Sequence, residues 1–218
     1  MALRDVLRRG LARQLSRPEG LRGRIVARGL NRGNGPAVAA AFRATGLGAG
    51  QVGADIGFGG GVGLPLLLDR VGPGGRVHGV ELSDTMLAAA RRRHRGDIEQ
   101  DRLTLAKGTL EHLPLADGDV DGLITVNTVY FVDDLRVVFD EIARVLSPTG
   151  RAVIGVADPE WMRSQPVVTT APVFRVRPVA DLVAALTAAG LDVRDDQLDD
   201  VRRFHLLVAT RKPIEDAE

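Results

Sequence analysis

The sequence contains no cysteine, which excludes disulfide bonds, thiolate zinc sites and a cysteine nucleophile. Histidine is scarce as well. The four histidines are scattered along the chain, at His78, His94, His112 and His205. Because no two of them have the helical spacing of a metal-binding pair, we expect no metal site. Long apolar runs are also missing, because no stretch approaches the ~18 continuous apolar residues of a transmembrane helix. These absences predict a cytoplasmic protein.

The composition is that of an ordinary globular domain. With 218 residues the chain fits one domain of generous size, or one domain plus an appendage. Its residues are 44% hydrophobic and 26% charged. Charge is distributed unevenly, because residues 1–32 carry nine arginines against two acids while the whole chain has a net charge of +1. Leucines at every fourth position from Leu3 to Leu15 predict an amphipathic helix, followed by a helix over about 20–30 and a third within GPAVAAAFRATGLG (35–48).

Beyond residue 50, apolar runs of strand length alternate with helical segments. Such alternation predicts a parallel sheet with helices on both faces. The expected strands span about 51–56, 76–81, 102–106, 120–127, 151–157, 191–198 and 203–210. The expected helices span about 62–71, 84–95, 134–146 and 179–189. The last two strands follow each other without a helix, which predicts an antiparallel pair at one edge of a seven-stranded sheet.

Five of the seven residues from 57 to 63 are glycines, between an expected strand and a leucine-rich helix. A dinucleotide fingerprint needs glycines at relative positions 1, 3 and 6 in this context. When Gly57 is counted as position 1, position 6 is Val62, and the literal match GAGQVG (48–53) lies before the strand. Instead, an acid, Asp55, precedes glycines at every second position. Because an acid repels a pyrophosphate and attracts a cation, this stretch points to a cationic ligand.

Glu81 ends the second expected strand, twenty residues after Gly61. A carboxylate at this place can accept hydrogen bonds from the 2′- and 3′-hydroxyls of a ribose. The alternative is a solvated acid at a strand end, but the pairing with the glycine stretch favours the ribose. Together, the two features indicate a nucleoside ligand that carries a positive charge and no phosphate.

These segments resemble the class I S-adenosylmethionine-dependent methyltransferases. DIGFGGG (55–61) is similar to the family's acid-x-Gly-x-Gly-x-Gly loop, and VELSDTMLAAAR (80–91) to its segment after the second strand. LPLADGDVDGL (113–123) and RVLSPTGRAVI (144–154) resemble the ubiquinone/menaquinone C-methylase-like branch. The resemblance covers residues 30–157 well. It implies a three-layer, doubly wound, Rossmann-like α/β fold, with a seven-stranded sheet that is mostly parallel and has an antiparallel edge strand.

The resemblance also implies a site for S-adenosylmethionine at the ends of the first four strands. Asp55 and the glycine stretch would contact the methionine part of the cofactor. Glu81 would bind the ribose, and Leu82 would pack on the adenine. In many relatives an Asp hydrogen-bonds the adenine amino group, and this chain has Thr109 at that position. Either the Thr109 hydroxyl or the backbone amide of Leu110 would then contact the adenine. Asn127 would lie under the sulfonium, and Asn31 and Asn34 resemble an N-terminal element that covers the cofactor. The implied set is Asp55, Gly57, Gly59, Gly61, Glu81, Leu82, Thr109, Leu110 and Asn127.

Methyl transfer from a sulfonium is an in-line displacement that needs alignment and exclusion of water, and a base only where the acceptor starts protonated. Ligands in such sheets bind outside the carboxyl ends of the strands, which places NTVYF (127–131) at the methyl group. Tyr130 is the candidate catalytic residue, through a hydrogen bond to an acceptor oxygen; the alternative is that it only packs there. His112 is expected to be a surface loop residue rather than a base.

Residues 158–178 contain four prolines, the chain's only tryptophan and no clear periodicity. A loop of this length predicts a lid or binding loop over the acceptor, with Trp161, Met162 and Phe174 as an apolar wall. A hydrophobic loop packed on the sheet is the alternative.

The Arg-rich start leaves several interpretations open. It lacks the apolar region of a signal peptide, and a transit peptide is an alternative. A solvated amphipathic helix over the cofactor pocket and a peripheral membrane contact through residues 1–30 are two further interpretations. Nucleic-acid binding is not expected, because the chain shows no RNA module and only 4% aromatic residues. The organisation that follows is an Arg-rich segment (1–34), a methyltransferase domain (35–212) and a tail (213–218).

The sequence thus predicts an S-adenosylmethionine-dependent methyltransferase that acts on a small, apolar or aromatic molecule by in-line transfer. Two alternatives stay open: an NAD(P)-dependent Rossmann oxidoreductase, and a non-catalytic protein that binds S-adenosylmethionine or docks on a membrane. The methyl acceptor, the methylated atom and the oligomeric state are left undetermined.

Overall fold

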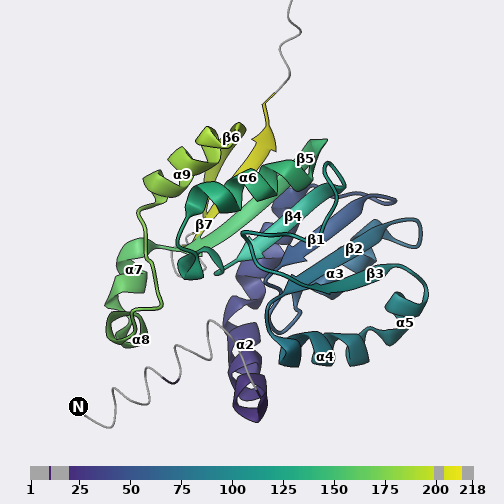
Figure 1. Ribbon diagram of the computed structural model, residues 1–218, viewed down its shortest axis with the longest axis horizontal. Coiled ribbons are helices and arrows are strands. Elements are labelled where there is room, and N and C mark those ends of the chain that lie inside the picture. The colour runs from purple at the N-terminus through teal and green to yellow at the C-terminus, as the bar shows by residue number, and fades with distance from the viewer. Residues whose placement is uncertain (1–9, 11–19, 199–203, 213–218) are drawn as a thin grey trace, which may run out of the picture.

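The computed structural model describes Gly10, residues 20–198 and residues 204–212. Its strands form one seven-stranded sheet in the order β3-β2-β1-β4-β5-β7-β6 (Figure 1). The strands are β1 (Val52–Ile56), β2 (Arg76–Glu81), β3 (Leu103–Lys107), β4 (Val120–Val126), β5 (Leu146–Ala157), β6 (Leu191–Leu198) and β7 (Phe204–Arg211). The pairs among β1 to β5 are parallel, whereas β7 runs antiparallel to both β5 and β6. The predicted, mostly parallel sheet with an antiparallel pair at one edge is confirmed.

Helices lie on both faces of the sheet. The helices of the described residues are α2 (Gly20–Thr45), α3 (Gly63–Val71), α4 (Asp84–Arg93), α5 (Arg95–Glu99), α6 (Leu135–Val145), α7 (Pro159–Ser164), α8 (Pro166–Thr170), α9 (Val179–Ala188) and the 3-10 turn η1 (Val129–Phe131). Helix α2 packs with α3 and α4, and α6 packs with α9 (Figure 1). The central strands are therefore enclosed between two helical layers, and their carboxyl ends open toward the loops that follow them.

Helix α6 shows how the sequence produces this layer. Asp134 caps its first turn, because the side chain accepts a hydrogen bond from the Arg136 amide at 2.8 Å. The buried side chains recur at helical spacing and form one stripe that faces the sheet: Val138, Phe139, Ile142 and Val145. Phe139 is the largest fully buried side chain of the described residues. The fold follows here from local capping together with one apolar stripe.

Two expectations about the helices are wrong. The helices predicted over 20–30 and within 35–48 join into the single helix α2, which contains Pro36 and runs across the expected boundary at residue 34. Glycine and proline lower helix propensity without forbidding helical torsion angles, so the Gly- and Pro-containing segment does not interrupt α2. The segment 158–178 was expected to be a loop, but it contains α7 and α8.

Helices α7 and α8 are six and five residues long, too short to show a periodic pattern in the sequence. Each begins with a proline, whose fixed φ suits the first turn of a helix. Asp158 adds a cap to α7, because its Oδ1 accepts a hydrogen bond from the Trp161 amide at 2.8 Å. Of the predicted first helix, over Leu3–Leu15, only Gly10 is described, and it is helical.

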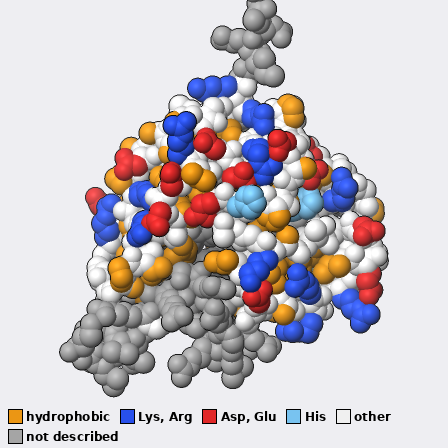
Figure 2. Space-filling model, viewed as in Figure 1, with side chains coloured by type: hydrophobic (Ala, Val, Ile, Leu, Met, Phe, Trp, Pro, Cys, Tyr) orange, Lys and Arg blue, Asp and Glu red, His pale blue; other side chains and the backbone are white. Residues whose placement is uncertain are grey.

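No helix within the described part of the chain is long and apolar enough to cross a lipid bilayer. On the face that Figure 2 shows, acidic and basic side chains are interspersed and no large area carries charge of one sign.

Candidate active site

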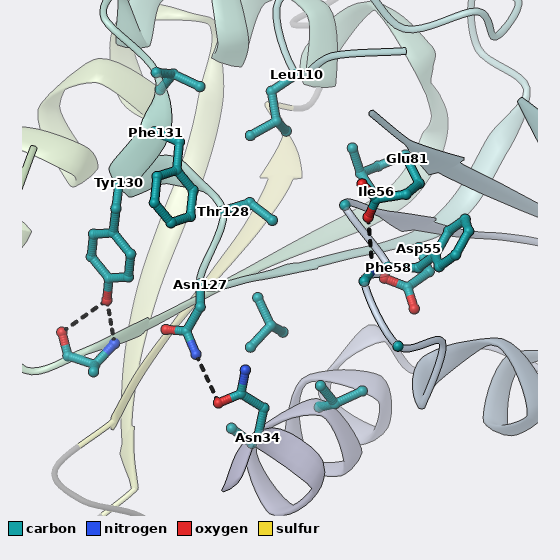
Figure 3. Close-up of a pocket in the computed structure, with 18 of the residues that line it drawn as sticks. Asn34, Asp55, Ile56, Phe58, Glu81, Leu110, Asn127, Thr128, Tyr130 and Phe131 are labelled. Carbon is teal, nitrogen blue, oxygen red and sulfur yellow. Dashed lines mark hydrogen bonds between the residues drawn. The ribbon is translucent and has the colours of Figure 1, made fainter. Parts of the chain in front are cut away.

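A cavity of about 510 Å³ opens at the carboxyl ends of the central strands. Its lining comes from the loops after β1, β2, β3 and β4, from α2, and from α7 and α8. Figure 3 shows the two acids Asp55 and Glu81 on one side and Tyr130 and Phe131 on the other, with Asn127 between them. The cavity therefore has an acidic half and an aromatic half.

The glycine stretch brings bare backbone to the acidic half. Gly57 adopts a φ of 70° and donates its amide to the Val80 carbonyl oxygen at 2.7 Å. A Cβ at Gly57 would lie 2.5 Å from Thr128 Cγ2, so a side chain is excluded there by both torsion and space. A Cβ at Gly63, the first residue of α3, would collide with Asp55 Oδ2 and lie 2.8 Å from Ile124 Cδ1. The helix can begin beside the Asp55 carboxylate only because Gly63 has no side chain.

Glu81 is held in place by backbone amides. Its Oε2 accepts a hydrogen bond from the Gly59 amide at 2.8 Å, and its Oε1 accepts one from the Ser83 amide at 2.8 Å. Burial raises the pKa of Glu81 above its usual range, and the hydrogen bonds from these amides oppose that shift. The loop after β1 and the end of β2 therefore orient one carboxylate, which lines the cavity together with Gly59.

Asp55 has a different environment. It is 6% exposed, and no group among the described residues donates a hydrogen bond to its carboxylate. Burial, followed by the neighbouring charge of Glu81, raises the pKa of Asp55 to about 8. A buried carboxylate with this pKa would be stabilised in its charged form by a cation in the cavity. The site therefore fits a ligand that carries positive charge.

Asn127 lies between the two halves and has an unusual backbone. Its φ is 60°, which is uncommon for a residue other than glycine, and its amide donates to the Gly155 carbonyl oxygen at 2.8 Å. Its side-chain Nδ2 donates to Asn34 Oδ1 at 3.2 Å, so that α2 closes over this part of the cavity (Figure 3). Asn127 Oδ1 is buried and has no partner among the described groups. Such an orphaned acceptor marks the place where a ligand can donate a hydrogen bond.

Nearly all the predicted cofactor-binding residues meet at this cavity. Those that line it are Asp55, Gly57, Gly59, Glu81, Leu82, Thr109, Leu110 and Asn127, and Asn34 joins them. Gly61 does not line the cavity; its amide donates to the Phe58 carbonyl oxygen at 2.8 Å and closes the turn. The side chain of Asn31 lies outside the described residues. Thr109 is exposed at the rim and Leu110 is buried, and His112 is exposed on the surface as expected. The individual contacts assigned to the cofactor stay predictions.

Tyr130 lines the aromatic half, but its hydroxyl is occupied by the protein. It donates to the Ala157 carbonyl oxygen at 3.3 Å and accepts a hydrogen bond from the Ala157 amide at 2.7 Å (Figure 3). Burial raises the pKa of Tyr130 far above its ordinary value. In this arrangement the hydroxyl fastens η1 to the end of β5, and a catalytic role for Tyr130 stays a prediction.

The rest of the aromatic half comes from segments beyond residue 157. The predicted wall residues Trp161, Met162 and Phe174 all line the cavity, and the Phe131 and Phe174 rings lie 5.2 Å apart between centroids. Sequence reasoning missed Phe204, the first residue of β7, which lines the cavity as well. No local motif marks Phe204, because only the pairing of β7 with β5 brings it to the site.

Comparison with known proteins finds similarity to methyltransferases. Residues 54–154 match the model of the methyltransferase domain. An arsenite methyltransferase of Halobacterium salinarum is 33% identical over 170 residues, which are 75% of this chain and 41% of that protein. A demethylmenaquinone methyltransferase of Symbiobacterium thermophilum is 37% identical over 95 residues, which are 43% of this chain and 38% of that protein. The chain thus spans about two fifths of the length of these relatives.

The fold is shared with solved structures. The crystal structure of a SAM-dependent methyltransferase from Aquifex aeolicus matches with a TM-score of 0.65 and 22% identity, over 81% of this chain and 88% of that chain. Together with the strand order and the glycine stretch that follows β1, these matches show that residues 54–154 form a methyltransferase domain with the fold of the S-adenosylmethionine-dependent methyltransferases.

Proposed function

We propose that the chain is an S-adenosylmethionine-dependent methyltransferase that acts on a small, apolar or aromatic molecule by in-line transfer. The observation that carries this proposal is the pair of buried carboxylates, Asp55 and Glu81, beside a glycine backbone in the same cavity as an aromatic wall. The cofactor is the methyl donor named for the related structure from Aquifex aeolicus.

The residues of the acidic half fit this cofactor. Asp55, which has no cationic partner among the described side chains, would face the positive charge of the cofactor, and Glu81, held by backbone amides, would accept hydrogen bonds from the ribose hydroxyls. Leu82 lines the cavity directly after Glu81, where the adenine would pack. When bound, S-adenosylmethionine supplies an electrophilic methyl group on a sulfonium.

The residues of the aromatic half would then hold the acceptor and keep water away. Trp161, Met162 and Phe174 present apolar surface next to Asn127, which lies between the halves. Holding two reactants in line is itself a large part of such catalysis, since a displacement of this kind depends on alignment and on a dry site.

Isothermal titration tests the proposal. We expect S-adenosylhomocysteine to bind in the micromolar range and NADH to show no binding. Glu81→Ala should weaken S-adenosylhomocysteine binding by about 1.5–3 kcal/mol, the contribution of charge-assisted hydrogen bonds. Glu99→Ala is the matched control, because this acid is exposed on α5 and only pairs with Arg95. Binding of NADH without binding of S-adenosylhomocysteine would overturn the proposal in favour of an oxidoreductase. Unchanged affinity in a folded Glu81→Ala variant would refute the ribose contact.

A further inference from the structure

We propose that the acceptor atom is an uncharged nitrogen of an apolar amine or nitrogen heterocycle, and that the nitrogen is methylated without a base from the protein. This inference rests on the proposed function and names its substrate class. Three features support it: the positions of the proton-accepting side chains, the negative charge of the cavity lining, and the unpaired hydrogen-bond acceptor Asn127 Oδ1.

The proton acceptors of the chain other than carboxylates lie away from the cavity, with the exception of Tyr130. Apart from carboxylates, the side chains of this sequence that can take a proton near neutral pH or above are four histidines, two lysines and one tyrosine, since cysteine is absent. All seven lie within the described residues, and only Tyr130 lines the cavity. His78, His94 and His205 bond to Asp119, Asp97 and Asp195, His112 is exposed, and Lys107 and Lys212 are exposed.

Tyr130 is not free to act as the base. Both hydrogen-bonding functions of its hydroxyl are used by the Ala157 backbone, and its pKa is raised by burial. An acceptor that must first lose a proton, such as a phenol or an acidic carbon, would find no free histidine, lysine or tyrosine among the described side chains of the cavity to take that proton. Of the carboxylates in the lining, Asp55 and Glu81 lie in the acidic half, across Asn127 from the aromatic rings (Figure 3).

The charges of the cavity favour a product that is positive. Its described lining contains Asp55, Glu81 and Glu111 and no lysine, arginine or histidine. An anionic acceptor would therefore enter an acidic, poorly solvated site without a cationic partner from these residues. A neutral nitrogen meets no such cost. When its lone pair forms the N–C bond and the S–C bond breaks, the electron pair goes to sulfur and the positive charge passes to nitrogen. The total charge in the cavity is conserved.

The aromatic wall suits both the acceptor and its cationic product. Phe131, Trp161 and Phe174 line the cavity, and aromatic faces attract cations as well as apolar rings. A primary or secondary amine then releases its N–H proton to water after the transfer, and a heterocyclic nitrogen stays charged. The orphaned Asn127 Oδ1 is a hydrogen-bond acceptor, so it can receive an N–H of the acceptor next to the aromatic half.

A set of acceptors matched in shape tests the inference. The purified chain is incubated with methyl-tritiated S-adenosylmethionine and quinoline, 1-naphthylamine, 1-naphthol or 1-naphthoate, and binding of the four to the protein loaded with S-adenosylhomocysteine is measured by calorimetry. We expect both nitrogen compounds to bind and to be methylated at least about tenfold better than the naphthoate and the naphthol. At saturating cofactor, the rate with quinoline should be flat from about pH 6 to 9, because no proton is removed.

Asn127→Gly separates the parts of the inference, because glycine keeps the φ of 60° and removes the amide. It should weaken binding of 1-naphthylamine several-fold more than binding of quinoline, which has no N–H. Equal or tighter binding of the naphthoate or the naphthol to the loaded protein, or preferred transfer to oxygen, would overturn the inference while the proposed function stands. Absence of S-adenosylhomocysteine binding would instead refute the proposed function.

Discussion

The two halves of the cavity are built by different means. The acidic half uses backbone: glycines without side chains, and amides that hold Glu81 in position, all within residues 54–154. The aromatic half uses side chains from residues beyond 157 and from η1. A site made of backbone tolerates few substitutions, because an added Cβ has nowhere to go. A site made of apolar side chains can change its shape by single substitutions, so the acceptor side is where specificity can vary.

The aromatic half is also attached differently. Arg177 donates to the carbonyl oxygens of Val132 and Asp133 at 2.8 Å each, and to that of Val129 at 3.4 Å. Two residues before Arg177, the Arg175 backbone amide donates to the Tyr130 carbonyl oxygen at 2.8 Å. The segment after α8 is thus fastened to the loop after β4 by an arginine, whereas the acidic half is fixed by the sheet itself. We expect substitutions in the two halves to affect different ligands.

The largest effect should come from Gly63→Ala. The new Cβ would collide with Asp55 Oδ2 and force the carboxylate or α3 to move. Overpacking of this kind costs about 1–3 kcal/mol of stability. Displacement of the Asp55 carboxylate should in addition lower the affinity for S-adenosylhomocysteine by up to about a hundredfold in calorimetry. Gly48→Ala is the matched control, since its Cβ would meet only Gln51 Oε1 at an ordinary 3.5 Å. Equal affinities for the two variants would show that the Asp55 carboxylate does not contribute to the site.

The pH dependence of cofactor binding should be next in size. With a pKa of about 8, Asp55 is mostly protonated at pH 7 in the empty site, whereas a bound cation favours its charged form. Affinity for S-adenosylmethionine should therefore fall about tenfold per pH unit below 8, with proton release on binding. Asp55→Asn should remove this slope. A flat affinity from pH 6 to 9 for the unsubstituted protein would contradict the assignment.

The same carboxylates make the empty protein less stable as pH rises. Because folding raises the pKa of Asp55 and Glu81, the folded state holds their protons more tightly than the unfolded chain does. The free energy of unfolding should therefore decrease as pH rises from about 4 to 8, as followed by urea unfolding. Asp55→Asn should flatten that decrease, and an unchanged pH profile for this variant would assign the effect to other groups.

Arg177→Ala should change the acceptor side alone. Losing its bonds to the loop after β4 should raise the KM for the acceptor several-fold, because hydrogen bonds from a charged group contribute about 1.5–3 kcal/mol. The affinity for S-adenosylhomocysteine should stay within about twofold. Arg136→Ala, which removes an exposed pair with Asp140, is the control. A parallel loss of cofactor affinity would show that the two halves are not independent.

Tyr130→Phe should have the smallest effect on turnover. Its hydroxyl bonds to the Ala157 backbone, so its loss should lower stability by about 1–3 kcal/mol and leave kcat nearly unchanged. Thermal unfolding and kinetics on the same preparation separate the outcomes. A large drop in kcat at unchanged stability would restore Tyr130 as a catalytic residue.

The comparison of the halves also explains what could be predicted from the sequence. Local patterns are sufficient for elements such as β2, whose predicted bounds match Arg76–Glu81, and for the acids at strand ends. They are insufficient where distant segments meet: Phe204 reaches the cavity only because β7 inserts between β5 and β6. The hydrogen bonds of Tyr130 to Ala157 are likewise tertiary, so the sequence could not distinguish a packed tyrosine from a reactive one.

A crystal structure with bound S-adenosylhomocysteine would test the central claim most directly. The account predicts both ribose hydroxyls on the Glu81 carboxylate, the amino group facing Asp55, and the sulfur directed past Asn127 toward the aromatic half. The ligand bound with its ribose away from Glu81, or with its sulfur directed away from Trp161 and Phe174, would contradict it.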